Sequence, residues 1–177
     1  MKNFIDGDSI YLRALNENDV NGPYSLWLND PIINEYNSHG RFPISEKQLL
    51  DYVISKTKSS SDLVLALIAK DSNKHIGNIS LQNINWIDKN AEIAFLLGDL
   101  EYTGKGIMFQ AGTLLINHGF KVLNLNRIYC GTSSKNIGMQ KLAKKLNMTK
   151  EGVRKEAIYK NGKYIDIIEY GILSKII

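Results

Sequence analysis

The most informative segment of this 177-residue chain reads Leu100-Glu-Tyr-Thr-Gly-Lys-Gly-Ile-Met108. It follows an apolar, strand-like segment and opens a segment with the apolar spacing of a helix. Glycine permits a backbone with positive φ, and the free N–H groups at the start of a helix attract anions. Taken alone, the glycines favour a plain strand-to-helix turn over a phosphate-binding turn. Their placement nevertheless makes a nucleotide-type cofactor the first hypothesis.

The composition predicts one globular domain over residues 1–177. Hydrophobic residues make up 44% of the chain, the formal net charge is +4, and the pI is about 9.0. Charges of both signs are scattered along the sequence, so its basic balance favours an anionic cofactor over a basic substrate. The single cysteine, Cys130, excludes an internal disulfide and a multi-thiolate metal site. We expect a cytoplasmic monomer or homodimer with no metal, no membrane contact and no nucleic-acid partner.

Hydrophobic periodicity predicts a mixed α/β layout. Strands are expected at residues 9–15, 63–69, 76–84, 92–97, 127–131, 157–159 and 164–173. Helices are expected at residues 16–28, 45–56 and 107–121 and around residues 139–146. Asn161-Gly162 predicts a type I′ turn between the last two strands. We therefore expect a single, mostly antiparallel sheet of six to seven strands flanked by helices.

Two common nucleotide-binding folds lack their motifs here. A dinucleotide-binding fold requires a Gly-x-Gly-x-x-Gly turn after an early strand and an acidic residue about 20 positions later. A P-loop requires Gly-Lys-Ser or Gly-Lys-Thr, and the sequence contains neither pattern. The cofactor is therefore expected to be neither a dinucleotide nor a nucleoside triphosphate.

Several segments carry a family resemblance. Glu101-Tyr-Thr-Gly104-Lys-Gly106 resembles the pyrophosphate loop of the GNAT acyl-CoA N-acetyltransferases, written [Gln/Arg]-x-x-Gly-x-[Gly/Ala]. The other matching segments are Tyr11-Leu-Arg-Ala-Leu15 with Asp19, Trp27-Leu-Asn-Asp-Pro31, Ala91-Glu92, and Asn136 with Lys145-Leu146. Their order resembles the branch that holds ribosomal-protein N-terminal, spermidine and amino-sugar acetyltransferases. The resemblance covers nearly the whole chain and implies acetyl-CoA as co-substrate and a sheet splayed at the strand before the loop.

The resemblance also implies a set of coenzyme A contacts. Backbone N–H groups of Gly104, Gly106, Ile107 and Met108 are expected around the pyrophosphate, with Lys105 adding a positive charge. The exposed backbone of the preceding strand is expected to pair with the pantetheine arm, and one of its amides to polarise the thioester carbonyl. The strand and flanking residues implied in these contacts are Phe95, Leu96, Leu97, Tyr102 and Asn136.

Glu92 is the candidate general base, often acting through water in the family that the chain resembles. The alternative is a structural carboxylate paired with a nearby lysine or arginine. The tyrosine that many family members use as general acid is replaced by Ala143. The thiolate is then expected to leave by another route, such as water, or catalysis rests mostly on positioning. Cys130 fits a small apolar strand residue better than a nucleophile.

Two other departures from the family pattern are present. Glu101 stands where the loop usually begins with Gln or Arg, and Asn147-Met148 replaces the usual Gly-Phe after the late helix. The loop change is tolerable if that position contributes mainly backbone.

The acceptor pocket is expected to include Tyr36, His39 and Arg41 from one loop and Asn83 and Trp86 from the end of a strand. The alternative for these residues is a surface loop with one buried anchor. An arginine binds phosphate or carboxylate bidentately, and a tryptophan stacks on a sugar or base. The preferred acceptor is therefore a small primary amine, specifically an amino sugar or a nucleotide-linked amino sugar.

Other functions remain open at the level of sequence. A protein N-terminus, including that of a ribosomal protein, is the runner-up acceptor. A polyamine is weaker because few carboxylates are available in the acceptor region. A non-enzymatic CoA-binding regulatory module would keep the glycine turn and lack a competent base. Nucleic-acid binding would rest on a lysine-rich stretch, which more simply forms a solvated helix face: Lys135, Lys141, Lys144, Lys145 and Lys150.

Overall fold

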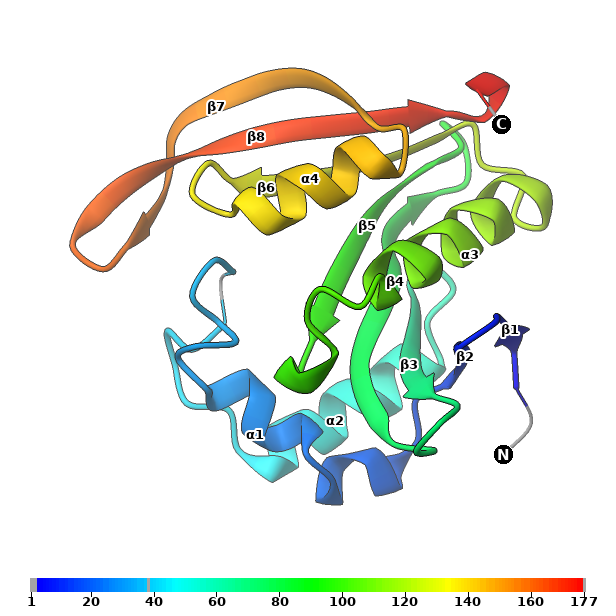
Figure 1. Ribbon diagram of the computed structural model, residues 1–177, viewed down its shortest axis with the longest axis vertical. Coiled ribbons are helices and arrows are strands. Elements are labelled where there is room, and N and C mark those ends of the chain that lie inside the picture. Colours follow the sequence, from blue (N-terminus) through cyan, green and yellow to red (C-terminus); the bar gives the residue numbers. More distant parts are fainter. Residues whose placement is uncertain (1–2, 38, 177) are drawn as a thin grey trace.

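A single open sheet organises the protein. The computed structural model describes residues 3–37 and 39–176 (Figure 1). The strands are β1 (Ile5–Asp6), β2 (Ile10–Ala14), β3 (Leu63–Ala69), β4 (His75–Asn85), β5 (Asn90–Leu97), β6 (Arg127–Ser133), β7 (Thr149–Lys160) and β8 (Lys163–Leu173). Their spatial order is β1-β2-β3-β4-β5-β6-β8-β7, and every pairing is antiparallel except β5 with β6. The mostly antiparallel mixed sheet is confirmed, with eight strands where six to seven were expected because the two-residue β1 adds an edge.

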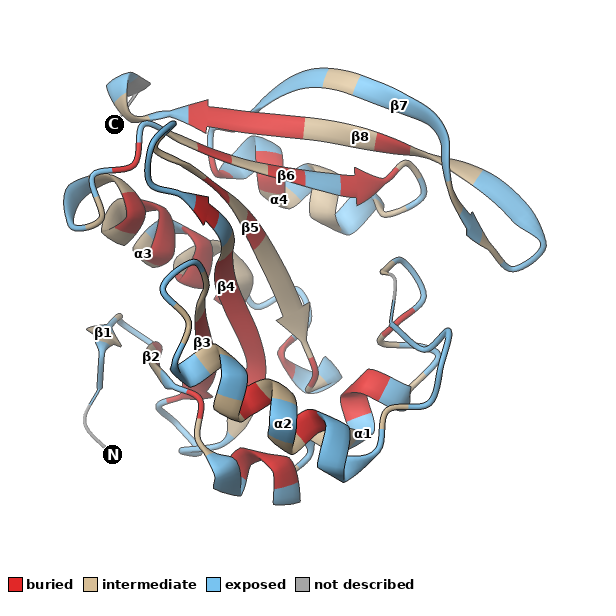
Figure 2. Cartoon of the chain, turned by 180° about the vertical axis from the view of Figure 1, so that it is seen from behind, coloured by how far each residue is buried: buried red, intermediate tan, exposed pale blue. Residues whose placement is uncertain are grey.

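Helices cover both faces of the sheet (Figures 1 and 2). The α-helices are α1 (Tyr24–Asn29), α2 (Glu46–Thr57), α3 (Ile107–Lys121) and α4 (Ile137–Lys145), and short 3-10 turns occur at η1 (Glu17–Asn21), η2 (Leu100–Tyr102) and η3 (Ser174–Ile176). Residues from α1 and α2 form one apolar core with β3, whereas α3 and α4 pack in a larger core on the opposite face. No helix among the described residues is long and apolar enough to cross a membrane.

The first helical segment differs from the prediction. The sequence indicated one helix over residues 16–28, but the structure contains a 3-10 turn and then the separate helix α1. Pro23 lies between them and is the N-cap of α1. Proline has no N–H to continue a helical ladder and is tolerated at a helix start, which explains the break. The second helix begins as predicted, because Ser45 and Gln48 cap each other's backbone.

The C-terminal hairpin is confirmed and longer than expected. Asn161 and Gly162 have φ values of 51° and 78°, which fits the type I′ turn that this pair favours. β7 and β8 extend from that turn and leave the body of the sheet, so the hairpin tip lies near the loop between α1 and α2 (Figure 1). The hairpin tip therefore approaches the side of the molecule that carries α1 and α2.

Candidate active site

The central strands β5 and β6 separate after three residue pairs. Their parallel pairing runs only from Asn90 opposite Arg127 to Glu92 opposite Tyr129. Beyond that point β5 continues along β4, while β6 pairs only with β8. The two strands thus form a V whose vertex lies at Glu92, and Figure 2 shows the opening between their far ends. The splay that the family resemblance implied is confirmed.

A cavity of about 700 Å³ lies in this opening. One wall is β5 from Glu92 to Leu96, and the opposite wall is β6 from Cys130 to Ser133 with the start of α4. Side chains from α1, α2 and the loop between them close the remaining side. The volume is in the range of sites for small organic ligands, and the lining combines apolar side chains with a few polar groups.

The glycine turn has the geometry of an anion site. Gly104 and Gly106 both have a φ of 77°, and a Cβ at either position would meet no atom within 4 Å. Both glycines are thus required by the backbone angle, and the space above them is open. Among the described residues, no backbone hydrogen bond is donated by the amides of Gly104, Gly106, Ile107 or Met108. These amides at the start of the 15-residue helix α3 fit the diphosphate of coenzyme A.

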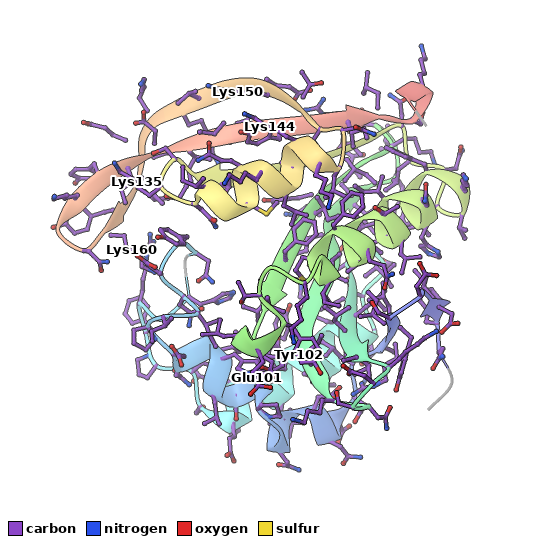
Figure 3. The ribbon with its side chains drawn as sticks, in the orientation of Figure 1. Glu101, Tyr102, Lys135, Lys144, Lys150 and Lys160 are labelled. Atoms are coloured by element: carbon purple, nitrogen blue, oxygen red, sulfur yellow. The ribbon has the colours of Figure 1, made fainter. Side chains whose placement is uncertain are left out.

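The side chain of Tyr102 anchors the turn. The residue is 8% exposed, and its hydroxyl hydrogen-bonds Ser72 at 2.9 Å and donates to Asp71 at 3.1 Å. The ammonium of Lys105 lies 4.9 Å from the centre of the Tyr102 ring. Figure 3 shows Tyr102 beside Glu101 at the end of the turn. The tyrosine hydroxyl therefore holds the turn on the β3–β4 connection, and the contact of Tyr102 with the coenzyme stays a prediction.

The backbone of β5 turns alternate groups toward the gap. The amide of Gly98 donates to the carbonyl of Ile76 on β4, so the amide of Gly98 points to β4. By alternation, the backbone groups of Leu96 also point to β4, whereas those of Phe95 and Leu97 point toward the gap. Of the three predicted pantetheine-pairing residues, Phe95 and Leu97 have free backbone groups and Leu96 does not.

The start of α4 lies across the gap from β5. Asn136 caps this helix by accepting a hydrogen bond from the amide of Met139 at 3.0 Å, and both residues line the cavity. Ala143 is 0% exposed in the large core, so no general acid is present at the position where the family tyrosine occurs. The ammonium of Lys145 lies 4.4 Å from the centre of the Phe109 ring in the first turn of α3. The two helices therefore meet beside the glycine turn.

Glu92 lines the cavity at the vertex of the V. Its residue is half-buried, and no ion pair or side-chain hydrogen bond involves it among the described residues. The alternative of a structural carboxylate paired with a lysine or arginine is therefore not realised. A free carboxylate facing a cavity can accept a proton from a bound amine.

The predicted acceptor residues separate into two groups. Tyr36, His39 and Arg41 line the cavity. Asn83 and Trp86 are absent from its lining. Asn83 follows the lining residue Gln82 and donates its amide to Asp62 at 3.2 Å, and Trp86 lies beyond the end of β4, where its indole N–H donates to the carbonyl of Ser60 at 2.8 Å. The expected sugar-stacking role of Trp86 is therefore wrong: the β4–β5 connection carries it away from the cavity.

The hairpin tip contacts the loop between α1 and α2 through residues that the sequence did not indicate. Lys160 donates to the carbonyls of Asn34 and Asn37, the latter at 2.9 Å, and Arg41 donates to the carbonyl of Tyr159 at 3.2 Å. Burial and the nearby charge of Arg41 lower the pKa of Lys160. Figure 3 places Lys160 at the end of the hairpin, next to the loop between α1 and α2 (residues 30–45), here called the front loop. No local signal marks these contacts, because they join residues more than 100 positions apart.

The cavity lining carries few charged side chains. Among the described lining residues, Glu92 is the only carboxylate. Of the basic side chains, Lys56 pairs with Asp62 at 2.9 Å, burial lowers the pKa of His39, and Arg41 forms no ion pair with a described residue. Burial, which dominates, raises the pKa of both Tyr24 and Tyr52, so these lining hydroxyls stay protonated and act only as hydrogen-bonding groups. No cluster of three or more metal-ligating side chains is present among the described residues. The lysines considered for nucleic-acid binding are all exposed and spread over the β6–α4 connection, α4 and β7, as Figure 3 shows for three of them.

Comparison with known proteins identifies what the chain resembles. Residues 9–149 match the family described as "Acetyltransferase (GNAT) domain". The chain is 30% identical over 99 residues to a putative ribosomal N-acetyltransferase, YdaF, of Bacillus subtilis (strain 168), an alignment that covers 56% of this chain and 54% of that protein. It is 32% identical over 92 residues to spermidine N(1)-acetyltransferase of Escherichia coli (strain K12), covering 52% of this chain and 49% of that protein. Each alignment thus spans about half of the relative.

The fold is shared over a greater length. The structure of spermidine N-acetyltransferase from Vibrio cholerae in complex with CoA and spermine superposes with a TM-score of 0.87 at 23% identity. That superposition covers 96% of this chain and 98% of the other.

Proposed function

The chain belongs to the GNAT acetyltransferase family, and we propose that it acetylates the primary amine of a small anionic molecule of the amino-sugar or nucleotide-linked amino-sugar class. Acetyl-CoA, the co-substrate of this N-acetyltransferase, supplies the acyl group as a thioester. The observation that carries the acceptor assignment is the lining of the cavity, where Arg41 and His39 accompany a single carboxylate, Glu92.

Glu92 is proposed as the general base. An amine must lose its proton before or during attack on a thioester carbonyl, and a positioned carboxylate is one of the groups that accept such protons. Glu92 lies at the vertex of the V, where the free backbone of β5 begins. An acceptor amine held there is adjacent to both the base and the strand that is proposed to hold the thioester.

The backbone of β5 is proposed to orient and polarise the thioester. The outward amides of Phe95 and Leu97 offer hydrogen bonds to the pantetheine arm or to the carbonyl oxygen. Gly104, Gly106, Ile107 and Met108 are proposed to bind the diphosphate, with Lys105 near it and Asn136 on the opposite wall. Transfer is then direct, within a complex of both substrates, because no nucleophilic side chain is proposed to carry the acetyl group.

Arg41 favours an acceptor that carries an anionic group besides its amine, because it forms no ion pair with a described residue. A guanidinium pairs with phosphate or carboxylate in bidentate geometry. Arg41 uses one of its nitrogens on Tyr159 and has further N–H groups to donate. A polyamine carries several positive charges, and a single carboxylate in the lining provides little to balance them.

A protein N-terminus is the second candidate acceptor. The named relatives include a putative ribosomal N-acetyltransferase, and residues of both the front loop and the long hairpin line the cavity. A flexible peptide end would enter between these two segments, whereas a small amine needs only the cavity itself.

The test is release of free thiol from acetyl-CoA with a panel of amines. The panel contains glucosamine, glucosamine 6-phosphate, a UDP-linked amino sugar, spermidine and short peptides with free N-termini. We expect the phosphorylated or nucleotide-linked amines to react best, and Arg41→Gln to lower kcat/KM for them about tenfold or more with little effect on uncharged glucosamine. Preference for spermidine or for the peptides would replace the acceptor assignment.

A further inference from the structure

A β-bulge in β4 places two polar side chains on the same face of the sheet. The register between β3 and β4 shifts between Leu67 and Ile68, so that Gly77 lies opposite Leu67 and His75 opposite Ile68. In a regular strand, residues three positions apart point to opposite faces. With the extra residue, His75 and Asn78 both face the α1 and α2 side, and Ile76 packs in the core on the other side.

His75 fixes the orientation of Asn78. The Nε2 atom of His75 lies 3.0 Å from the carbonyl oxygen of Gly77 and 2.9 Å from Oδ1 of Asn78. Because a carbonyl oxygen can only accept, Nε2 carries the hydrogen, and the Asn78 atom that faces it is the amide oxygen. The Nδ2 group of Asn78 therefore points away from the imidazole.

The imidazole is itself held on all sides. Its ring makes edge contacts with the rings of Trp27 at 5.1 Å and Tyr24 at 6.0 Å. Its unprotonated Nδ1 atom forms no hydrogen bond with a described residue and lies 3.7 Å from the carboxylate of Asp19, whose charge Arg13 balances with two hydrogen bonds of 2.6 and 2.8 Å. The position of His75 is thus determined by α1, η1 and β2 together.

The amide nitrogen of Asn78 is a buried donor that lacks a well-formed hydrogen bond to a described residue. Asn78 is 5% exposed and lines the cavity, and its Nδ2 forms no hydrogen bond of standard geometry with a described residue, although the Tyr24 hydroxyl lies near the same side chain. An unpaired buried N–H group costs about 1–3 kcal/mol, so such groups usually have a partner in the working state of a protein. Ser80, two residues further along the same face, differs because its hydroxyl already accepts a hydrogen bond from Gln82 at 2.8 Å.

The geometry points to Asn78 as a substrate-recognition residue whose Nδ2 donates to an oxygen of the acceptor, with His75 as its positioning residue. The donor lies on the same face and in the same cavity as Glu92. The acceptor would therefore carry a hydroxyl, carbonyl or anionic oxygen near its amine. This inference rests on the proposed function, since it assigns a role in the same cavity.

The variants separate recognition from folding. Asn78→Asp keeps an oxygen toward His75 and replaces the donor by an acceptor, whereas Asn78→Ala removes both. His75→Gln retains an N–H donor, and His75→Phe keeps an aromatic ring without one. Ser80→Ala is the matched control because it removes a cavity-lining polar group that already has an intramolecular partner.

The first measurement is steady-state kinetics on the panel amine that wild type acetylates best. We expect Asn78→Asp and Asn78→Ala to raise KM for the amine about tenfold, with KM for acetyl-CoA and kcat within about threefold of wild type. His75→Phe is expected to raise KM for the amine in the same direction, and His75→Gln to restore it. A purely structural role predicts instead a lower thermal midpoint with KM unchanged, which would overturn the inference.

The second measurement does not require turnover. In protein labelled with ¹⁵N-asparagine and saturated with CoA, the Asn78 side-chain resonances are those missing from the Asn78→Asp spectrum. We expect the panel amine that binds to shift these resonances, and CoA alone to leave them in place. A shift without thiol release from any amine would retain the recognition role and reject the proposed function. Thiol release with no shift from any amine would reject Asn78, and neither signal would reject both.

Discussion

Glu92 faces Tyr129 across the last rung of the parallel pairing between β5 and β6, and beyond this rung the strands separate. The carboxylate therefore lies where two strands stop pairing, beside backbone groups that no neighbouring strand satisfies. This position combines a proton acceptor with hydrogen-bonding backbone in a single cavity.

Replacing Glu92 tests its role as the general base. Glu92→Gln is expected to lower kcat for the best amine about 100-fold, because loss of a positioned base typically costs a factor of this order. CoA affinity measured by calorimetry is expected to stay within twofold of wild type. Asp51→Asn, which changes an exposed carboxylate on α2, is the control. Full activity of Glu92→Gln would assign the carboxylate a different role.

The glycine turn is tested by adding methyl groups. Gly104→Ala and Gly106→Ala force an L-residue to a φ of 77°, which costs about 1–2 kcal/mol or moves the turn amides. We expect CoA binding by calorimetry to weaken at least about fivefold for each variant. Gly152→Ala is the matched control, because that glycine also has open space around its Cβ position but lacks a positive φ. Unchanged CoA binding by both turn variants would contradict the amide cradle.

A close approach of α1 to the end of β5 is tested at Gly98. A Cβ on this residue would lie 1.9 Å from the indole of Trp27, so no methyl group fits without moving the helix. Gly98→Ala is expected to lower the free energy of unfolding by about 2–3 kcal/mol in urea titrations. The double variant with Trp27→Leu should be less destabilised than the sum of the single variants. Additive losses would mean that the two residues do not contact each other.

Acid stability is expected to depend on Asp19. Burial opposes ionisation of this carboxyl, but the guanidinium of Arg13 and the amide of Asn16 outweigh it and hold its pKa below the ordinary value. A lowered pKa stabilises the fold above the unfolded value of about 3.9, and this contribution is lost as the pH falls through the folded value. Asp19→Asn is expected to be about 3 kcal/mol less stable at pH 7, because it leaves Arg13 without its partner.

The difference in the free energy of unfolding between Asp19→Asn and wild type should shrink as the pH is lowered from about 5 toward 2. Asp62 also has a lowered pKa, so the stability of both wild type and variant still falls somewhat at acid pH. Asp166→Asn, which breaks an exposed pair with Lys155, is expected to change stability much less. A difference in the free energy of unfolding that stays constant across this pH range would refute the role of Asp19 in acid stability.

Cys130 is expected to be chemically inert. Burial, with the negative charges of Glu92 and Glu169, raises the pKa of its thiol to about 12, and its sulfur lies 4.0 Å from that of Met148. The reactive thiolate is therefore scarce at neutral pH. Cys130→Ala should retain most activity, and iodoacetamide should not inactivate the wild type. Rapid inactivation or an acetylated cysteine in mass spectra would point to a covalent route.

The strongly patterned elements followed from the sequence. The apolar run of β3, the spacing of α3 and the Asn161-Gly162 turn each depend on neighbours within a few residues, so local periodicity indicated them. The single helix expected over residues 16–28 is interrupted at Pro23, which is a local signal for a helix start. The prediction that Trp86 contacts the acceptor failed for a different reason. The direction of the β4–β5 connection depends on strand pairing, which no local pattern fixes.

The glycine turn, the carboxylate at position 92 and the family to which the chain belongs were readable from the order of residues, because backbone angles and short motifs are local properties. Folding alone brought His75 to Asn78 through a bulge, Trp27 to Gly98, and Lys160 to the front loop. These contacts arise from strand order and register, which couple segments far apart in the chain, and no pattern within one segment encodes them.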